Sequence, residues 1–276
     1  MRTVAAVSVV RLEAGEMRQA DDAVAVEEPL ELRCATAGSG EPRPLNVTMR
    51  TPGDDLDWAY GFLFTEGLIA SAHDVVDAVF DGQTVTVTLR PGLALDPTKV
   101  ERNFYVSSSC GVCGKASLEA VQTVCPEYEA PVWRVAPEVL HALPTTLRDA
   151  QRAFGLTGGI HAAGWFDRSG ALLAHREDVG RHNALDKLLG HALRTGHIPL
   201  NYSILLLSGR ASFELLQKSA MAGIQLVCAV GAPSSLAIEL ASTFGITLVG
   251  FLREDRMNVY SGPERLNPQR PTAVNL

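Results

Sequence analysis

Two cysteines three positions apart form the strongest chemical pattern in the chain. Cys110 and Cys113 lie in a run of serines and glycines that ends at Lys115. The sequence predicts a strand at residues 103–106 before this loop and a helix at residues 115–124 after it. Both thiols would then lie near the free N–H groups of a helix start, which favour a thiolate. A thiolate in a loop of small residues is suited to attack, carry or hand on sulfur.

Two other kinds of chemistry fit the same pair of thiols. A structural zinc ion needs four ligands. Cys34, Cys125 and His141 are available, but no second Cys-x-x-Cys or His-x-x-x-His pair is present. A thioredoxin-like dithiol is the other alternative, although that fold places its motif early in a βαβ unit. Both alternatives, and an inert pair of loop cysteines, stay open at this point.

A second candidate site follows three strands in the second half of the chain. Ser208, Gly209 and Arg210 come directly after an apolar run, residues 231–235 follow the next one, and Arg253 and Arg256 follow the third. The carboxyl ends of parallel strands meet at one edge of a sheet, where open α/β sheets bind their ligands. Two of the loops also open helices, whose free N–H groups favour phosphate. The sequence therefore predicts an anion site at this edge.

The start of another predicted helix, at residues 179–193, breaks a local rule. Arg181 and His182 would lie in its first turn, where a cation opposes the helix dipole. Residues that are unfavourable for local structure in this way tend to mark a functional site. Two interpretations remain: an anionic ligand at the helix start, or pairing of these cations with Glu177 and Asp178.

The hydrophobic pattern predicts an α/β protein, α+β overall, in two parts. A small strand-rich α+β domain is expected over residues 1–106, with one helix at residues 54–68. Residues 107–132 would hold a mobile Cys-x-x-Cys loop and the helix after it. A three-layer αβα domain is expected over residues 133–276, because short apolar runs alternate with amphipathic segments there.

Composition excludes several classes of protein. The chain has 276 residues, of which 46% are hydrophobic, and a formal net charge of -7. The charge gives no global basic field for nucleic acid or an anionic membrane. No apolar run approaches the roughly 20 residues of a transmembrane helix. Five cysteines, an odd number, are typical of reduced thiols. We expect a soluble cytoplasmic protein with no nucleic-acid or membrane partner.

Several of these segments resemble the FdhD family of formate dehydrogenase accessory sulfurtransferases. The resemblance is carried by Ser108 to Lys115, Gly159 to Ala163, Arg176 to Lys187, Ser208 to Ser212 and Ala232 to Ala237. It extends to residues 50–53, 61–63, 66–67 and 258–260. It therefore spans most of the chain, and the Arg-Glu-Asp-Val-Gly-Arg-His-Asn run is highly specific.

The resemblance implies a sulfur carrier for a molybdenum cofactor. Persulfide sulfur would pass from a cysteine desulfurase to Cys110, with Cys113 as helper or alternate acceptor. It would then pass to the molybdenum bis-molybdopterin guanine dinucleotide cofactor before that cofactor enters formate dehydrogenase. GDP or a related guanine nucleotide would mimic the cofactor, and the family implies a homodimer.

The resemblance also implies a cofactor-binding segment and a fold. The segment comprises Phe251, Leu252, Arg253, Glu254, Asp255 and Arg256. We add Ser208, Gly209, Arg210, Arg181 and His182 as candidate cofactor-binding residues. The second domain is similar to the cytidine deaminase fold but lacks the deaminase zinc signature, so we expect neither metal nor deamination. A non-covalent cofactor chaperone and a thiol-disulfide oxidoreductase are the alternative functions.

Overall fold

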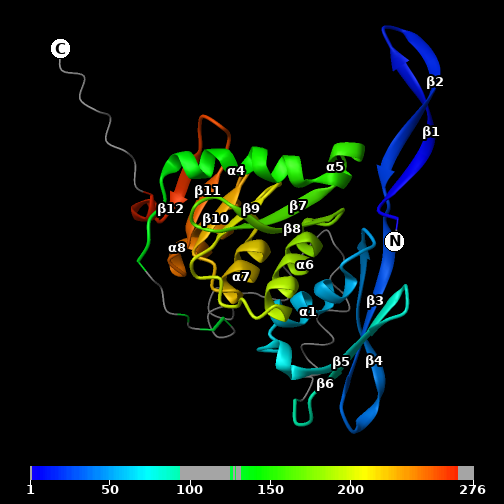
Figure 1. The fold of residues 1–276 in the computed structure, drawn as a ribbon, viewed down its shortest axis with the longest axis vertical. Helices are drawn as coiled ribbons and strands as arrows, with labels where there is room; N and C mark the ends of the chain where they lie inside the picture. Colours follow the sequence, from blue (N-terminus) through cyan, green and yellow to red (C-terminus); the bar gives the residue numbers. More distant parts are fainter. Residues whose placement is uncertain (1, 94–124, 127, 129–131, 267–276) are drawn as a thin grey trace.

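A computed structural model describes residues 2–93, 125–126, 128 and 132–266 of the chain (Figure 1). Cys110, Cys113, the predicted strand at residues 103–106 and the predicted helix at residues 115–124 lie outside these residues. Among the described residues, no helix is long and apolar enough to cross a membrane.

The chain begins with a two-stranded hairpin. Strands β1 (Val4–Glu13) and β2 (Glu16–Ala25) pair antiparallel from Val4 opposite Ala25 to Glu13 opposite Glu16. Ala14 and Gly15 between them both have positive φ, which two-residue hairpin turns require. In Figure 1 the tip of the hairpin projects beyond the two larger sheets, and both of its strands also contact α5.

A four-stranded sheet and one helix follow. The strands β3 (Glu28–Thr36), β4 (Ser39–Arg50), β5 (Val75–Phe80) and β6 (Thr84–Leu89) have the order β4-β3-β6-β5. Helix α1 (Asp55–Thr65) and the short helix η1 (Ala72–Asp74) connect β4 to β5. The helix predicted at residues 54–68 is confirmed as α1.

The second half of the chain builds a six-stranded sheet with the order β12-β11-β10-β9-β7-β8. Its strands are β7 (His161–Phe166), β8 (Leu172–Asp178), β9 (Ile204–Leu207), β10 (Leu226–Ala229), β11 (Thr247–Gly250) and β12 (Asn258–Ser261). Strands β9, β10 and β11 are parallel, as predicted, whereas β7 runs antiparallel to β9 and β12 antiparallel to β11.

Helices cover both faces of this sheet, which confirms the three-layer arrangement (Figure 1). One face carries α4 (Pro137–Ala150) and α5 (Arg152–Thr157), and the other carries α6 (Arg181–Arg194), α7 (Phe213–Met221) and α8 (Ser235–Thr243). Side chains of β9 alternate between two cores: Leu205 and Leu207 join the α6–α8 side, and Ile204 and Leu206 join the α4 side. A short helix η2 (Pro263–Arg265) follows β12.

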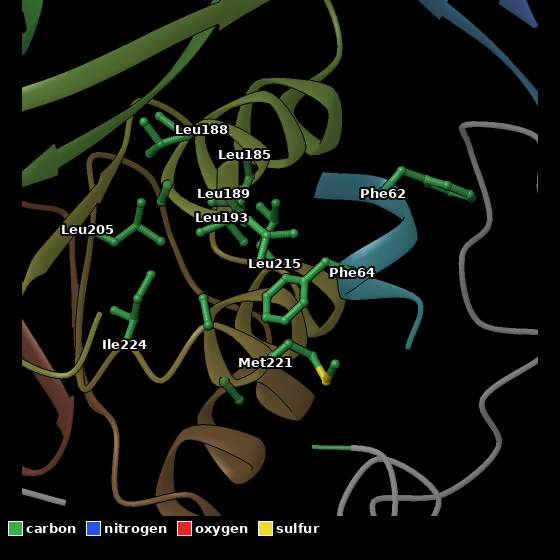
Figure 2. Packing of buried hydrophobic residues seen from close by; sticks show 14 of the residues in the cluster. Phe62, Phe64, Leu185, Leu188, Leu189, Leu193, Leu205, Leu215, Met221 and Ile224 are labelled. Atoms are coloured by element: carbon green, nitrogen blue, oxygen red, sulfur yellow. The ribbon is translucent and has the colours of Figure 1, made fainter. Parts of the chain in front are cut away.

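Helices α1 and α6 join the two halves of the chain. At their crossing, a Cβ atom on Gly61 would lie 1.8 Å from the Asp186 carbonyl oxygen, and one on Gly190 would lie 1.8 Å from the Asp57 carbonyl oxygen. Only glycine permits this approach. One hydrophobic core therefore contains residues from both halves, and Figure 2 shows Phe64 of α1 beside Leu215 of α7. The domain boundaries at residues 106 and 133 stay a prediction.

Candidate functional site

Three loops meet at the carboxyl edge of the parallel strands, as the strand order predicts. Residues 208–212 follow β9, residues 231–235 follow β10, and residues 251–256 follow β11. Their backbones are hydrogen-bonded to one another: Gly231 N donates to Gly209 O at 2.8 Å, and Phe251 N donates to Gly231 O at 3.1 Å. A Cβ atom on Gly231 would lie 2.9 Å from Gly209 O, so a side chain there would separate two of the loops.

The antiparallel strand β7 brings His161 to the same edge. The Ala162 N–H donates to Ser208 Oγ at 2.8 Å, and Ser208 N donates back to Ala162 O at 3.0 Å. A Cβ atom on Gly209 would lie 3.2 Å from His161 Nδ1, so the imidazole lies close against the β9 loop. Ser208 and Gly209 therefore join the end of β9 to the start of β7, in addition to forming a turn.

The acidic residues of the Arg176 to Asn183 run have structural partners. Glu177 accepts hydrogen bonds from Ala153 N at 3.0 Å and Phe154 N at 2.8 Å, which satisfies free N–H groups at the start of α5. Asp178 is fully buried and lies 2.7 Å from Lys187 Nζ. Strand β8 continues to Asp178, so both residues lie at the end of a strand.

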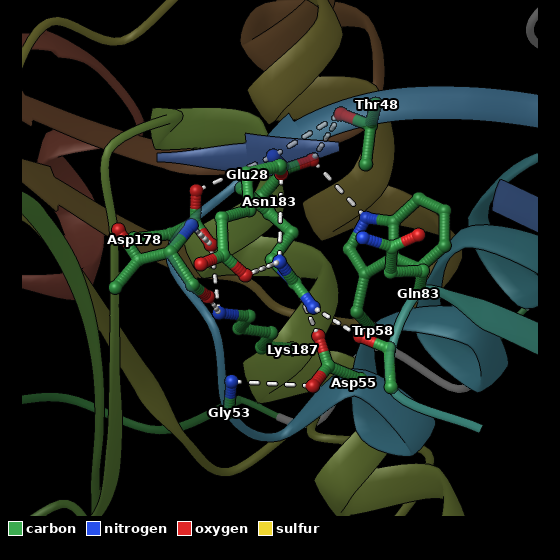
Figure 3. A network of polar contacts seen from close by, with 12 residues as sticks. Glu28, Thr48, Gly53, Asp55, Trp58, Gln83, Asp178, Asn183 and Lys187 are labelled. Carbon is green, nitrogen blue, oxygen red and sulfur yellow. Dashed lines mark hydrogen bonds and ion pairs between the residues drawn. The ribbon is translucent and has the colours of Figure 1, made fainter. Parts of the chain in front are cut away.

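A buried polar network fixes the start of α6 against the N-terminal half. Asp178 accepts hydrogen bonds from Thr51 N at 3.1 Å and Gly180 N at 2.8 Å. Asn183 donates to the Met49 carbonyl at 2.8 Å. Figure 3 shows Asn183 beside the Trp58 indole, which donates to Asn183 Oδ1 at 3.1 Å. The first turn of α6 is therefore held by contacts across the two halves.

Arg181 and His182 have different surroundings within that first turn. Arg181 Nε is buried and has no hydrogen-bond partner among the described residues. Glu177 and Asp178 have other partners, which does not favour the interpretation that they pair with Arg181. His182 Nε2 lies 3.3 Å from Glu214 Oε2 and 3.4 Å from Ser212 Oγ. Burial lowers the pKa of His182 to about 4, against the opposing effect of Glu214.

The positive charges at this edge disfavour protonation of His161. Burial lowers the pKa of His161, and the charges of Arg181 and Arg210 lower it further. The imidazole is therefore neutral near pH 7, flanked by two guanidinium groups. The positive charges of Arg181 and Arg210 would favour an anion at this edge, and the anion site itself stays a prediction.

A cavity of about 600 Å³ opens between this edge and the α4–α5 side of the sheet. Three predicted residues line it, namely Ser208, Leu252 and Arg253. The remaining lining residues are Pro144, Leu147, Arg148, Gln151, Phe154, Gly158, Gly159, Ile160, His161, Leu206 and Val230. Arg148 of α4 and Gln151, which lies between α4 and α5, were not predicted, because they belong to no sequence motif that indicates a ligand.

The loop after β11 lies between that cavity and a smaller one. Phe251, Arg253, Arg256 and Asn258 line a second cavity of about 300 Å³, so Arg253 borders both. Arg253 Nη1 donates to the Val230 and Leu252 carbonyls, each at 2.7 Å, which fixes its guanidinium across the strand ends.

The other residues of this loop differ in what they offer a ligand. Leu252 is fully buried in the α4-side core, although it also lines the larger cavity. Glu254 Oε1 accepts a hydrogen bond from Thr145 Oγ1 at 2.8 Å, and Asp255 is exposed. Gly209, Arg210, Arg181 and His182 line neither cavity. The predicted binding residues therefore fall into two groups along one edge, and His161 lies between them.

The cysteines within the described residues are not suited to nucleophilic chemistry. Cys34, Cys125 and Cys228 are buried. Burial raises the pKa of Cys34 to about 12 and also raises that of Cys228. His141 Nδ1 contacts the Arg253 carbonyl oxygen at 2.7 Å. Cys34 and His141 therefore have structural surroundings that do not favour the zinc alternative.

Comparison with known proteins gives consistent matches over nearly the whole chain. The model of the FdhD/NarQ family matches residues 25–267. A sulfur carrier protein FdhD from Streptomyces coelicolor is 49% identical over 270 residues, covering 94% of both chains. The protein of that name from Mycobacterium tuberculosis is 47% identical over 274 residues, covering 94% of this chain and 96% of its own.

A solved structure is similar as well. The crystal structure of a proposed formate dehydrogenase accessory protein from Desulfotalea psychrophila has a TM-score of 0.76 and 25% identity. The match covers 96% of this chain and all of that one.

Proposed function

The chain belongs to the FdhD/NarQ family, and from this premise we propose that it is a sulfur carrier in the maturation of formate dehydrogenase. Relatives named sulfur carrier proteins, at up to 49% identity, support the transfer of sulfur. The likeness to a proposed formate dehydrogenase accessory protein supports the recipient. The proposed acceptor is the molybdenum bis-molybdopterin guanine dinucleotide cofactor, and the proposed donor is a cysteine desulfurase.

The proposed first step is a persulfide exchange at Cys110. Its thiolate attacks the outer sulfur of the donor's persulfide, a Cys110–sulfur bond forms, the donor's S–S bond breaks, and the donor leaves as a thiolate. Cys110 then carries a persulfide. To leave as sulfide, the outer sulfur needs two electrons. Once the acceptor is bound, attack by the Cys113 thiolate on the inner sulfur supplies them, because it releases hydrosulfide to the acceptor and leaves a Cys110–Cys113 disulfide; without the acceptor the persulfide stays on Cys110.

The single observation that supports cofactor binding is the cavity at the strand ends, with Arg253 beside it. It measures about 600 Å³, the range of ligand pockets. Arg253 and Arg256 provide planar donors for phosphate groups. Arg181 and Arg210 extend the positive charge along the same edge. An anchored nucleotide would fix the acceptor while Cys110 brings the sulfur, so that positioning supplies most of the rate enhancement.

Two variants should separate the transfer of sulfur from binding. Cys110→Ala should abolish maturation of formate dehydrogenase and leave the affinity for GDP unchanged. Arg256→Ala should weaken GDP binding and still accept sulfur from the desulfurase. We choose Arg256 because it is exposed, whereas Arg253 also bonds two carbonyls that hold the loop. Full maturation with Cys110→Ala would show that Cys110 is not the carrier.

Two alternative functions predict other results. A cofactor chaperone that performs no covalent step would bind GDP, accept no sulfur, and tolerate Cys110→Ala. A thiol-disulfide oxidoreductase would cycle a Cys110–Cys113 disulfide and reduce a model disulfide substrate without a desulfurase. The family also leads us to propose a homodimer, which sedimentation equilibrium would test.

A further inference from the structure

One buried amide nitrogen at the larger cavity has no hydrogen-bond partner among the described residues. Five buried side-chain polar atoms of the described residues lack a hydrogen-bond partner: Gln151 Nε2, Arg176 Nε, Arg181 Nε, Gln217 Oε1 and Gln225 Oε1. Gln151 is the one of these residues that lines the cavity of about 600 Å³. It is 5% exposed. A buried polar group without a partner is costly, so its presence calls for an explanation.

The backbone holds Gln151 in place at a break between two helices. Helix α4 ends at Ala150 and α5 begins at Arg152, and Gln151 itself has φ -76° and ψ 87°. Glu177 accepts both Ala153 N and Phe154 N, which anchors the first turn of α5. The backbone of Gln151 is therefore fixed by a helix on each side, which limits where its carboxamide can lie.

The walls around this amide suit a flat heterocycle. Leu147, Ile160, Leu206 and Val230 provide apolar surface, and Phe154 provides an aromatic ring. The Arg148 guanidinium lies 4.4 Å from the centre of that ring. Apolar and aromatic walls with a few fixed polar groups are typical of pockets for planar ligands.

We propose that Gln151 is a binding residue for the edge of the guanine base, an assignment that rests on the proposed function. A carboxamide carries a donor beside an acceptor. The guanine edge presents an acceptor, O6, beside a donor, N1–H, so the two groups are complementary. The nitrogen of Gln151 would donate to O6, and its oxygen would accept from N1–H. The base would thus supply the partner that the described residues do not provide, while Arg253 and Arg256 remain for the phosphates.

The test compares Gln151→Met with wild type by titration calorimetry, using GDP and inorganic pyrophosphate as probes. Methionine keeps the length of glutamine and removes the amide. We expect GDP affinity to fall about 10- to 100-fold. Pyrophosphate affinity should stay unchanged. The thermal midpoint of the free variant should be equal or higher, because an unpaired buried amide is lost.

Gln225→Met is the matched control. Gln225 also has a buried amide atom without a hydrogen-bond partner in the described part of the chain, but it precedes β10, at the opposite end of that strand from the cavity. This variant should bind GDP as wild type does.

Equal GDP affinity in Gln151→Met and wild type would overturn the assignment and leave the proposed function intact. Equal losses of GDP and pyrophosphate affinity in Gln151→Met would assign Gln151 a structural role only. A wild-type protein that binds no GDP would overturn both proposals.

Discussion

Replacing Gly190 by alanine should strongly destabilise the protein through one backbone contact. The new Cβ would lie 1.8 Å from the Asp57 carbonyl oxygen and 2.6 Å from Gly61 N. Since van der Waals contact needs roughly 3.4 Å, α1 and α6 would have to separate by about 1.5 Å. A gap of that size forfeits more than half of the dispersion energy between the facing atoms. The cost should therefore exceed the 1–3 kcal/mol of ordinary overpacking and reach about 3–5 kcal/mol.

Urea unfolding followed by circular dichroism would measure this loss. Gly155→Ala is the control, because Gly155 lies in α5, is exposed, and has no atom within 4 Å of an added Cβ. It should leave stability unchanged or raise it by up to about 1 kcal/mol, because alanine favours a helix. If Gly190→Ala unfolds within 0.5 kcal/mol of wild type, α1 and α6 do not cross at backbone contact and the reasoning is refuted.

Three further perturbations test the surroundings of the site. Burial holds the pKa of His182 at about 4, so between pH 6.5 and 4 the unfolded chain binds a proton that the folded chain does not. The free energy of unfolding should therefore fall by up to about 3 kcal/mol over that range. His182→Gln should reduce this fall in denaturant titrations, whereas His73→Gln, at an exposed position, should leave it unchanged. Lys187→Met should cost about 3–5 kcal/mol in a denaturant titration, because it leaves the buried Asp178 carboxylate without its cation; a loss below 1 kcal/mol would contradict this. Glu177→Gln should cost about 1–2 kcal/mol and speed hydrogen exchange in α5, and unchanged exchange would argue against the capping role.

The periodicity of hydrophobic residues predicted most helices and strands in the second half of the chain. The runs at β9 and β10 are continuous and apolar, which is typical of strands buried on both faces. This pattern of buried parallel strands was enough to predict that the loops after β9, β10 and β11 meet at one edge of the sheet. Strand β12 was not predicted, because its four residues are partly exposed at the sheet edge and carry little hydrophobic signal. The break at Gln151 could not be predicted, because no Gly or Pro lies between residues 145 and 154 to mark the end of a helix.

The candidate site was only partly predictable. The cations Arg181, Arg253 and Arg256 were found from their positions after strands and at a helix start. The lining residues of α4 and α5 reach the cavity through the packing of a helix pair on the sheet, which short-range spacing does not encode. The roles of Glu177 and Asp178 also depend on partners distant in sequence, so the sequence left their pairing open.

The most direct test of the proposed function is peptide mass spectrometry after anaerobic incubation with a cysteine desulfurase and isotopically labelled cysteine. Cys110→Ala and Cys113→Ala would be treated alongside the wild-type protein. The proposed function predicts one labelled sulfur on the Cys110 peptide of wild type and of Cys113→Ala, and none on Cys110→Ala. A wild-type protein that binds GDP but acquires no labelled sulfur on Cys110 would contradict it.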